Sequence, residues 1–379
     1  MDKLARIRAK NSLGPAVTEY LNKHRSVPIF RVRESYPNFN FIRLVAASSV
    51  IFSHAFLIAE GDQTREPLIR LLGPGNSIGI YGVHCFFMIS GFLVTQSVLH
   101  SNSVLEYLWR RFLRIYPGLF VCLLISAFVM GALLSQQGPL HFLASSEPFR
   151  YVFRNLWHPG RSGDMPSVIF YPGSGWLGGS INGSLWSIFH EVTCYILLAL
   201  LYLIGALRSW AMASLAVAMI VVAANGLTPN SETMRDFLFV APSFLVGAAY
   251  SIAELKRTSA IVVAISALVV LSLAVWYEVF SILFPLAGAP LILLLGTSRF
   301  VRLPQLKGIG DISYGTYLYG WPVEQLVRAA AGPSAGWTTI FLVSLPISYL
   351  LGCASWWMVE RPALKLKTIY RRDWASEPG

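Results

Sequence analysis

The sequence predicts an all-helical membrane protein that crosses the bilayer about ten times. Of its 379 residues, 55% are hydrophobic and 13% are charged, whereas soluble domains carry about 25% charged residues. Apolar runs of spanning length recur along the whole chain, and Lys and Arg collect in alternate loops. Together these observations predict the fold class: an all-α polytopic membrane protein with both termini in the cytoplasm.

The predicted spans are the apolar runs near residues 40–58, 78–97, 113–134, 184–204, 210–225, 237–253, 259–275, 278–297, 311–330 and 338–358. Glycine and proline interrupt several of these runs, which membrane helices tolerate where neighbours satisfy the freed backbone groups. We therefore divide the chain into a cytoplasmic N-terminal arm (1–39), a transmembrane domain (40–360) and a basic cytoplasmic tail (361–379).

The basic residues of the loops set the predicted orientation. If the N-terminus is inside, the arm, the Arg110/Arg111/Arg114 loop and the C-terminal tail all face the cytoplasm. Loops rich in Lys and Arg stay on the cytoplasmic side. The net charge of +11 follows from this bias, so it gives no reason to expect a nucleic-acid partner.

Cysteine and histidine spacing predicts neither disulfides nor a metal. The cysteines lie inside apolar runs, where we expect small core residues: Cys85, Cys122, Cys194 and Cys353. The histidines show neither the H-x-x-x-H nor the H-E-x-x-H spacing of a metal site.

The first predicted span, residues 38–60, carries Arg43 and His54 eleven positions apart. On a helix this spacing is three turns plus about 20°, with about 16 Å of rise, so both side chains share one face. An ionisable residue inside a membrane helix marks a pathway or a site. The alternative is that a neighbouring helix satisfies His54 and that Arg43 anchors the helix at the cytoplasmic surface.

This spacing resembles the Arg/Lys-x10-His motif of membrane acyltransferase family 3. The second run, YGVHCFFMISGFLVTQS, resembles that family's Gly-Val-Asp segment, with His84 in place of the usual Asp. Its Ser90 and Gly91 are small residues, for which we expect close helix packing.

The third segment, Leu108 to Pro117, resembles the family's Arg-x-x-Arg motif. Arg111 and Arg114 are three positions apart and share a helix face. Guanidinium groups suit phosphate oxygens, so we interpret the pair as a phosphate clamp. Spacing alone favours the alternative, a positive-inside anchor.

Residues 135–183 form the longest predicted outer connection. Its aromatic residues include Trp157, Phe170, Tyr171 and Trp176. Flat aromatic faces suit a sugar ring, and we expect Trp176 to contact substrate. The alternative is that these side chains simply populate the membrane interface.

The next run, Ile181 to Glu191, resembles the family's Gly-Ser-Leu-Trp-Ser…Glu signature. If its helix starts at the outer surface, Glu191 lies about 10 Å below that surface, the same depth as His54. We therefore expect Glu191 to orient His54. We expect Trp186 and Ser187 to contact substrate, and His190 to make an interhelical bond.

The last motifs are Gly310 to Pro322, which resembles the family's Gly-Asp-x-Ser-Tyr run, and the Glu360-Arg361-Pro362 ending. We expect Tyr317 and Glu324 to contact substrate, with Glu324 near the depth of His54.

The resemblance implies transfer of an acyl group, usually acetyl, from cytoplasmic acyl-coenzyme A to a hydroxyl of a surface or lipid-linked glycan. Arg43, Arg111 and Arg114 would hold the donor's phosphates, with acetyl-coenzyme A a substrate and no cofactor bound. His54 would act as general base or acyl carrier. The implied location is the bacterial inner membrane. Two rivals stay open: a transporter of an acyl donor or lipid-linked sugar, and a receptor or assembly subunit.

Overall fold

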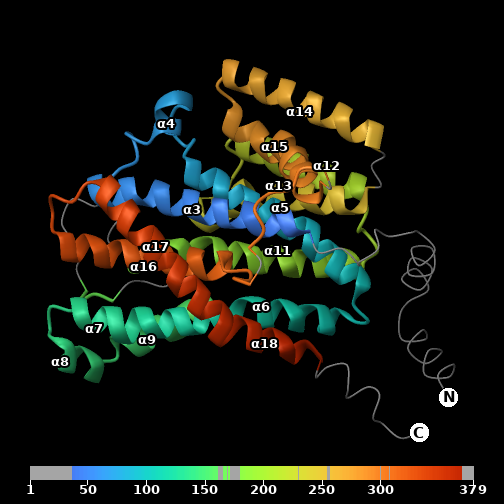
Figure 1. Ribbon diagram of the computed structural model, residues 1–379. Helices are drawn as coiled ribbons and strands as arrows, with labels where there is room; N and C mark the ends of the chain where they lie inside the picture. Colours follow the sequence, from blue (N-terminus) through green and yellow to red (C-terminus); the bar gives the residue numbers. More distant parts are fainter. Residues whose placement is uncertain are drawn as a thin grey trace, which may run out of the picture.

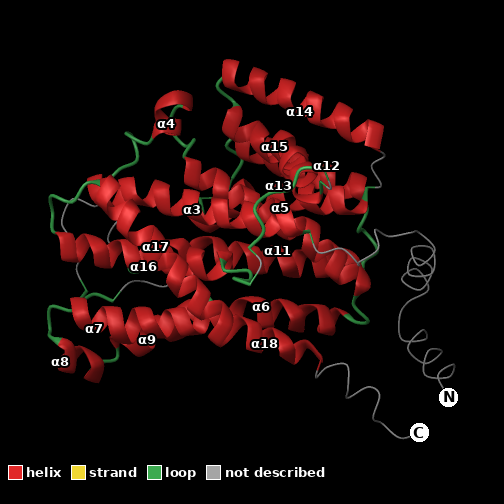
Figure 2. Cartoon of the chain, in the orientation of Figure 1, coloured by secondary structure: helices red, strands yellow, loops and turns green. Residues whose placement is uncertain are grey.

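The computed structural model shows a bundle of helices and describes residues 36–368 except 161–164, 169, 171–179, 229, 254–256, 299 and 307 (Figures 1 and 2). The main helices are α3 (Pro37–Glu60), α5 (Ile78–His100), α6 (Val104–Leu124), α11 (Trp186–Leu203), α12 (Ser209–Ala224), α13 (Glu232–Ile252), α14 (Arg257–Trp276), α15 (Phe280–Thr297), α16 (Ser313–Ala331) and α17 (Trp337–Ser355). Shorter elements are α4 (Pro67–Leu72), η1 (Ile125–Met130), α7 (Gly131–Leu134), α8 (Pro139–Ala144), α9 (Glu147–Trp157), η2 (Gly183–Leu185), η3 (Trp356–Glu360), α18 (Arg361–Lys365) and η4 (Leu366–Thr368).

The all-helical class is confirmed, since the described residues contain no strand beyond an isolated bridge between Ser135 and Val168. Within the described part of the chain, six segments are long and apolar enough to cross a membrane: Asn38–Glu60, Ile78–His100, Val104–Leu134, Gly183–Leu203, Phe280–Thr297 and Trp337–Lys365. The count of about ten spans, the cytoplasmic placement of both termini and the domain limits stay predictions. Residues 1–35 of the arm and 369–379 of the tail lie outside the described residues.

Helix α3 packs against α5, α15, α16 and α17 (Figure 1). It runs antiparallel to α5, because Gly79 meets Ser53 whereas Gly82 meets Ala46. It runs parallel to α16. Arg43 and His54 therefore lie at two different heights along the bundle.

Glycines bring α5 and α13 into backbone contact. A Cβ atom at Gly91 would lie 2.0 Å from the carbonyl oxygen of Phe244, and one at Gly247 would lie 2.1 Å from that of Met88. No larger residue fits at either position without separating the helices. The close packing predicted at Gly91 is confirmed.

Proline 322 determines where η2 attaches to α16. Because proline lacks an N–H, the carbonyl of Leu318 loses its helical partner. Asn182 Nδ2 donates to that carbonyl at 3.0 Å instead. One turn away, Trp321 Nε1 donates to the carbonyl of Ser180 at 2.7 Å. The chain therefore enters α11 against the middle of α16.

The predicted outer connection, 135–183, contains α8 and α9, and α9 packs along α6 (Figure 1). The imidazole of His158, just after α9, lies 4.3 Å from the ring of Phe189 in α11, centroid to centroid. Gly160 packs against the backbone of Trp186, because a Cβ atom added at Gly160 would lie 2.4 Å from the backbone nitrogen of Trp186. The sequence reading of this segment as an outer loop thus missed two helices and their return into the bundle.

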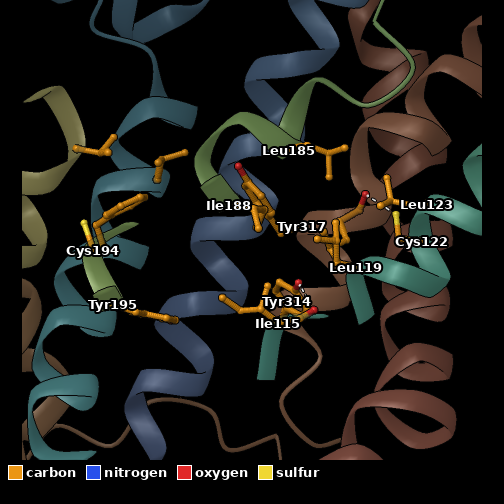
Figure 3. Packing of buried hydrophobic residues seen from close by; sticks show 14 of the residues in the cluster. Ile115, Leu119, Cys122, Leu123, Leu185, Ile188, Cys194, Tyr195, Tyr314 and Tyr317 are labelled. Atoms are coloured by element: carbon orange, nitrogen blue, oxygen red, sulfur yellow. Dashed lines mark hydrogen bonds between the residues drawn. The ribbon is translucent and has the colours of Figure 1, made fainter. Parts of the chain in front are cut away.

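The buried core lies where α5, α6, α11 and α16 meet. Figure 3 shows Tyr314 and Tyr317 of α16 beside Ile115 of α6 and Ile188 of α11. The Tyr314 hydroxyl donates to the carbonyl of Ile115 at 2.8 Å. This core forms one wall of the pocket described next.

Candidate active site

Asp311, in the loop before α16, holds two arginines from separate helices. Its Oδ2 lies 2.8 Å from Nη1 of Arg43 and 2.6 Å from Nη2 of Arg114. Ser313 Oγ donates to the other oxygen at 2.7 Å. All three charged side chains are at least four-fifths buried. Their interactions therefore fix the start of α16 against α3 and α6.

Glu360 adds a second carboxylate to this network. Pro362 cannot donate an amide to the preceding turn, and the chain forms the π-helical turn η3 just before it. There Glu360 is 1% exposed; its Oε2 lies 3.3 Å from Nη1 of Arg114, and its Oε1 accepts from Ser355 at 3.0 Å. Arg114 thus forms ion pairs with two carboxylates, Asp311 and Glu360.

Arg111 differs from Arg114. Its guanidinium lies over the ring of Tyr195, 5.9 Å from the centroid. Among the described residues it has no carboxylate partner within ion-pair distance, and its Nε is buried without a hydrogen bond. Nearby, burial together with Arg111, Arg110 and Arg114 lowers the pKa of Lys367. Arg111 therefore presents a positive charge that has no ion-pair partner in the described part of the chain.

These groups surround one pocket, which we call the arginine pocket. It encloses about 690 Å³, including its open mouth. Its polar lining consists of Arg43, Ser90, Arg111, Arg114, Ser187, Glu191, Tyr195, Tyr314 and Tyr317, and the remainder is apolar. Glu191 Oε1 accepts hydrogen bonds from the hydroxyls of Ser90, at 3.0 Å, and Tyr195. A long ligand with an anionic end matches this mixture of charge and apolar surface.

His54 lies outside the arginine pocket, toward the other end of α3. Its side chain is 15% exposed, and its Nδ1 is buried 3.7 Å from Oε2 of Glu324. The indole of Trp321 meets the imidazole edge-on, with centroids 4.6 Å apart. Tyr317, one turn before Trp321, lines the pocket. One face of α16 therefore connects the pocket to His54.

The expected partnership of Glu191 with His54 differs from the contacts observed. Glu191 lines the pocket with Arg43, and Glu324 is the carboxylate beside His54. The depth argument assumed that α11 starts at the membrane surface. Instead, the chain before α11 is held against Tyr317 and Trp321, so Glu191 lies at the level of Arg43.

The other predicted site residues divide into groups. Ser187 and Tyr317 lie together in the pocket, with their hydroxyl oxygens 2.6 Å apart. Trp186 is half-buried and packs on His190 rather than in the pocket, with centroids 5.8 Å apart. Trp176 lies outside the described residues.

Sequence reasoning assigned no role in the site to Asp311, Glu360 or Tyr195. A signal was present for the carboxylates, since both occur in motifs beside predicted membrane helices, where an acidic residue needs a cation. Tyr195 is one turn after Glu191, so their bond follows from helix spacing.

Three comparisons place the chain among known proteins. The acyltransferase-domain family matches residues 36–357. The chain is 26% identical to an O-acetyl transferase of Shigella phage Sf6 over 340 residues, 85% of this chain and 94% of that protein. It is 28% identical to nodulation protein 10 of Rhizobium leguminosarum bv. viciae over 372 residues, 87% of this chain and 94% of that protein.

No solved structure shows significant similarity. The family match covers most of the chain, including α3, α16 and the arginine pocket. The chain belongs to the acyltransferase-domain family and is a membrane acyltransferase.

Proposed function

We propose that the protein is an O-acyltransferase that moves an acyl group, with acetyl as the expected group, from cytoplasmic acyl-coenzyme A to a hydroxyl of a surface or lipid-linked glycan. The named activity of the phage relative supports acetyl transfer to oxygen. The observation that carries the proposal is on α3. Arg43 lines a cationic pocket, and a partly exposed histidine lies about 16 Å further along the same helix.

The arginine pocket would hold the donor. Coenzyme A is anionic at its nucleotide end, and Arg111 offers a guanidinium without a carboxylate partner among the described residues. Arg43 and Arg114 are held by Asp311, so they form a fixed part of the pocket wall. Because Asp311 neutralises part of their charge, they would attract the donor's phosphates less strongly than Arg111 does. Lys367 adds positive charge near Arg111.

The pantetheine arm would carry the thioester from this pocket toward His54. Its route follows the face of α16 that presents Tyr317 and then Trp321. His54 is not part of the pocket wall, so the Tyr317 side chain would shift to admit the arm past Trp321. Ser187, bonded to Tyr317, is placed to follow that movement.

At His54 the chemistry would be general-base catalysis. Nδ1 is buried without a hydrogen-bond partner and Nε2 is not, so Nε2 is the nitrogen that would face a substrate. It removes the proton of the sugar hydroxyl as the oxygen attacks the thioester carbon; the C–S bond breaks, and the imidazolium returns the proton to the thiolate. In the alternative route, Nε2 attacks the thioester carbon and the coenzyme A thiolate leaves; the sugar oxygen then takes the acyl group from Nε2, and the hydroxyl proton passes through the released imidazole to the thiolate.

The proposed location is the bacterial cytoplasmic membrane, with the Arg43 level facing the cytoplasm, where acyl-coenzyme A is made. The acceptor then reaches His54 from the opposite side. The partners are the acyl-coenzyme A donor, the glycan acceptor and membrane lipid.

The test uses purified full-length protein in lipid vesicles with labelled acetyl-coenzyme A and a lipid-linked saccharide acceptor. The proposal predicts label in the saccharide as an alkali-labile ester. Mass spectrometry of surface glycans from cells with and without the gene then identifies the acceptor. Donor consumption without any acylated acceptor, together with unchanged glycans, would refute it.

A non-catalytic transporter of an acyl donor or lipid-linked sugar is the second candidate. The buried pair of His54 and Glu324 favours it, because ionisable pairs inside membrane helices also serve transport. The same vesicles separate the two functions. A transporter moves intact labelled donor or saccharide across the membrane and forms no ester.

A further inference from the structure

We propose that Glu324 is the positioning residue for His54: its carboxylate holds the imidazole with Nδ1 turned inward and stabilises the imidazolium that forms when Nε2 accepts the sugar proton. This inference deepens the proposed function and rests on it. It also assigns to Glu324 the orienting role that the sequence suggested for Glu191.

The first support is the isolation of the pair. Glu324 is fully buried, and neither carboxylate oxygen has a hydrogen-bond partner among the described residues. The Nδ1 of His54 has none either. The 3.7 Å between Nδ1 and Oε2 exceeds hydrogen-bond length, and catalytic bonds often shorten only when substrate binds. A modest rotation of the ring would close it.

The second support is the cost of burying charge. An ionised carboxylate without a partner costs several kcal/mol in a protein interior. His54 is the group beside Glu324 that can supply a positive charge. When Nε2 accepts a proton, the pair becomes a neutral ion pair, so Glu324 favours the protonated form of His54. This is the role of the carboxylate in a Ser-His-Asp triad.

The third support is the fixed aromatic wall. Trp321 is one turn before Glu324 on the same face of α16. Its indole nitrogen donates to the carbonyl of Ser180, and Gln325 donates to the same carbonyl at 3.1 Å. The indole is therefore held in place beside the imidazole and forms a wall of the space in which that ring lies.

The other charged groups near this end of α3 are already held. Glu66 accepts from Ser53 Oγ at 3.1 Å and from two backbone amides. Arg328 of α16 donates to carbonyls that include the one of Ala59. Glu60 pairs with Arg65 at 3.2 Å. In α5, His84 meets Ser243 of α13, and neither α15 nor α17 carries an acidic or basic side chain.

The experiment measures the pH at which His54 loses its proton, with and without catalysis. Wild type, Glu324→Gln and Glu324→Asp are compared as purified full-length proteins in vesicles. Carbethoxylation of His54 by diethyl pyrocarbonate, located by mass spectrometry, reports the unprotonated fraction without donor or acceptor. Initial rates against pH report the same group during acetyl transfer.

Removing the carboxylate lets His54 lose its proton more easily. We expect the midpoints of both curves to move to lower pH by about 1 unit in Glu324→Gln. The maximal rate falls about 10-fold or more while the KM for donor stays constant. Glu324→Asp recovers part of both effects. The matched control is Glu66→Gln, another buried carboxylate near Ser53, which should leave the midpoints unchanged.

Thermal unfolding verifies that each variant is folded. Folded Glu324→Gln protein with wild-type midpoints overturns the positioning role even if acetyl transfer is normal. A shifted carbethoxylation midpoint in Glu324→Gln, when the wild-type protein itself transfers no acetyl group, keeps the pairing and refutes the proposed function. Loss of rate without any shift of midpoint marks Glu324 as merely structural and overturns the inference.

Discussion

Arg114 and Asp311 lie 197 positions apart in the sequence, yet Nη2 of the first is 2.6 Å from Oδ2 of the second. Arg43 reaches the same oxygen from α3. This shared carboxylate joins three segments of the chain and holds the wall of the arginine pocket. The cations that sequence reasoning assigned together to phosphate therefore divide into two that pair with Asp311 and one, Arg111, for which the described residues supply no carboxylate partner.

Replacing Asp311 with Ala should destabilise the protein by about 3–5 kcal/mol, because it leaves two mostly buried guanidinium groups without their shared partner. Thermal or denaturant unfolding of detergent-solubilised protein measures the change. The exposed Asp62→Asn variant serves as control and should unfold like wild type. Equal stability of Asp311→Ala and wild type would show that this network does not hold the bundle.

Replacing Arg111 with Ala should raise the KM for acyl-coenzyme A by about 10- to 100-fold, with a smaller change in kcat. A hydrogen bond to a charged group contributes about 1.5–3 kcal/mol. The KM of Arg111→Lys should lie between those of wild type and Arg111→Ala, since lysine keeps the charge and lacks the planar guanidinium group. Rates are measured against donor concentration at low ionic strength.

The comparison variant is Arg114→Ala, which removes a cation bonded to Asp311 and Glu360. We expect it to lower the yield and melting temperature of the protein more than Arg111→Ala does. If both variants unfold like wild type and bind donor equally well, Arg111 is a membrane anchor and the pocket does not hold the nucleotide end.

The level of Glu191 can be tested by crosslinking in a background without the four native cysteines. Ser90→Cys with Glu191→Cys should crosslink with a short reagent, because the two side chains are hydrogen-bonded at 3.0 Å. His54→Cys with Glu191→Cys should not, whereas His54→Cys with Glu324→Cys should. Efficient crosslinking of 54 to 191 would restore the register in which α11 starts at the membrane surface.

Gly91→Ala should destabilise the protein strongly. The added methyl would lie 2.0 Å from the backbone carbonyl of Phe244, which cannot move without separating α5 from α13. Gly336→Ala is the matched control, because its nearest neighbour is 4.0 Å away. Similar melting temperatures for the two variants would mean that these helices are not in backbone contact.

The sequence predicted the helical class and the positions of the helices well, since apolar runs determine both. The expectation that Arg43 and His54 share one face of α3 follows from helix geometry alone, and the chemical roles of both residues stay predictions. Rise per residue failed for Glu191, however. Rise per residue gives distance along a helix only. The height in the bundle at which α11 begins depends on the carbonyl of Leu318, which has no helical partner because of Pro322 and accepts from Asn182 instead.

The sequence also did not predict which side chains of different helices contact one another. The amino-acid sequence indicates that a buried Arg114 needs a counter-charge, but it does not indicate that Asp311 and Glu360 supply that charge. Likewise, Glu324 was expected near the depth of His54, yet its contact with the imidazole depends on how α16 packs against α3. Such pairings are properties of the folded bundle.

The most direct test of the account is the rate of acetyl transfer by His54→Ala in vesicles, with the exposed His100→Ala as control. A positioned general base contributes about 10²–10⁴-fold, so His54→Ala should lose at least about 99% of wild-type kcat while it unfolds like wild type. His100→Ala should retain full activity. A folded His54→Ala protein that keeps more than about a tenth of the wild-type rate would contradict the account, whichever chemical route His54 takes.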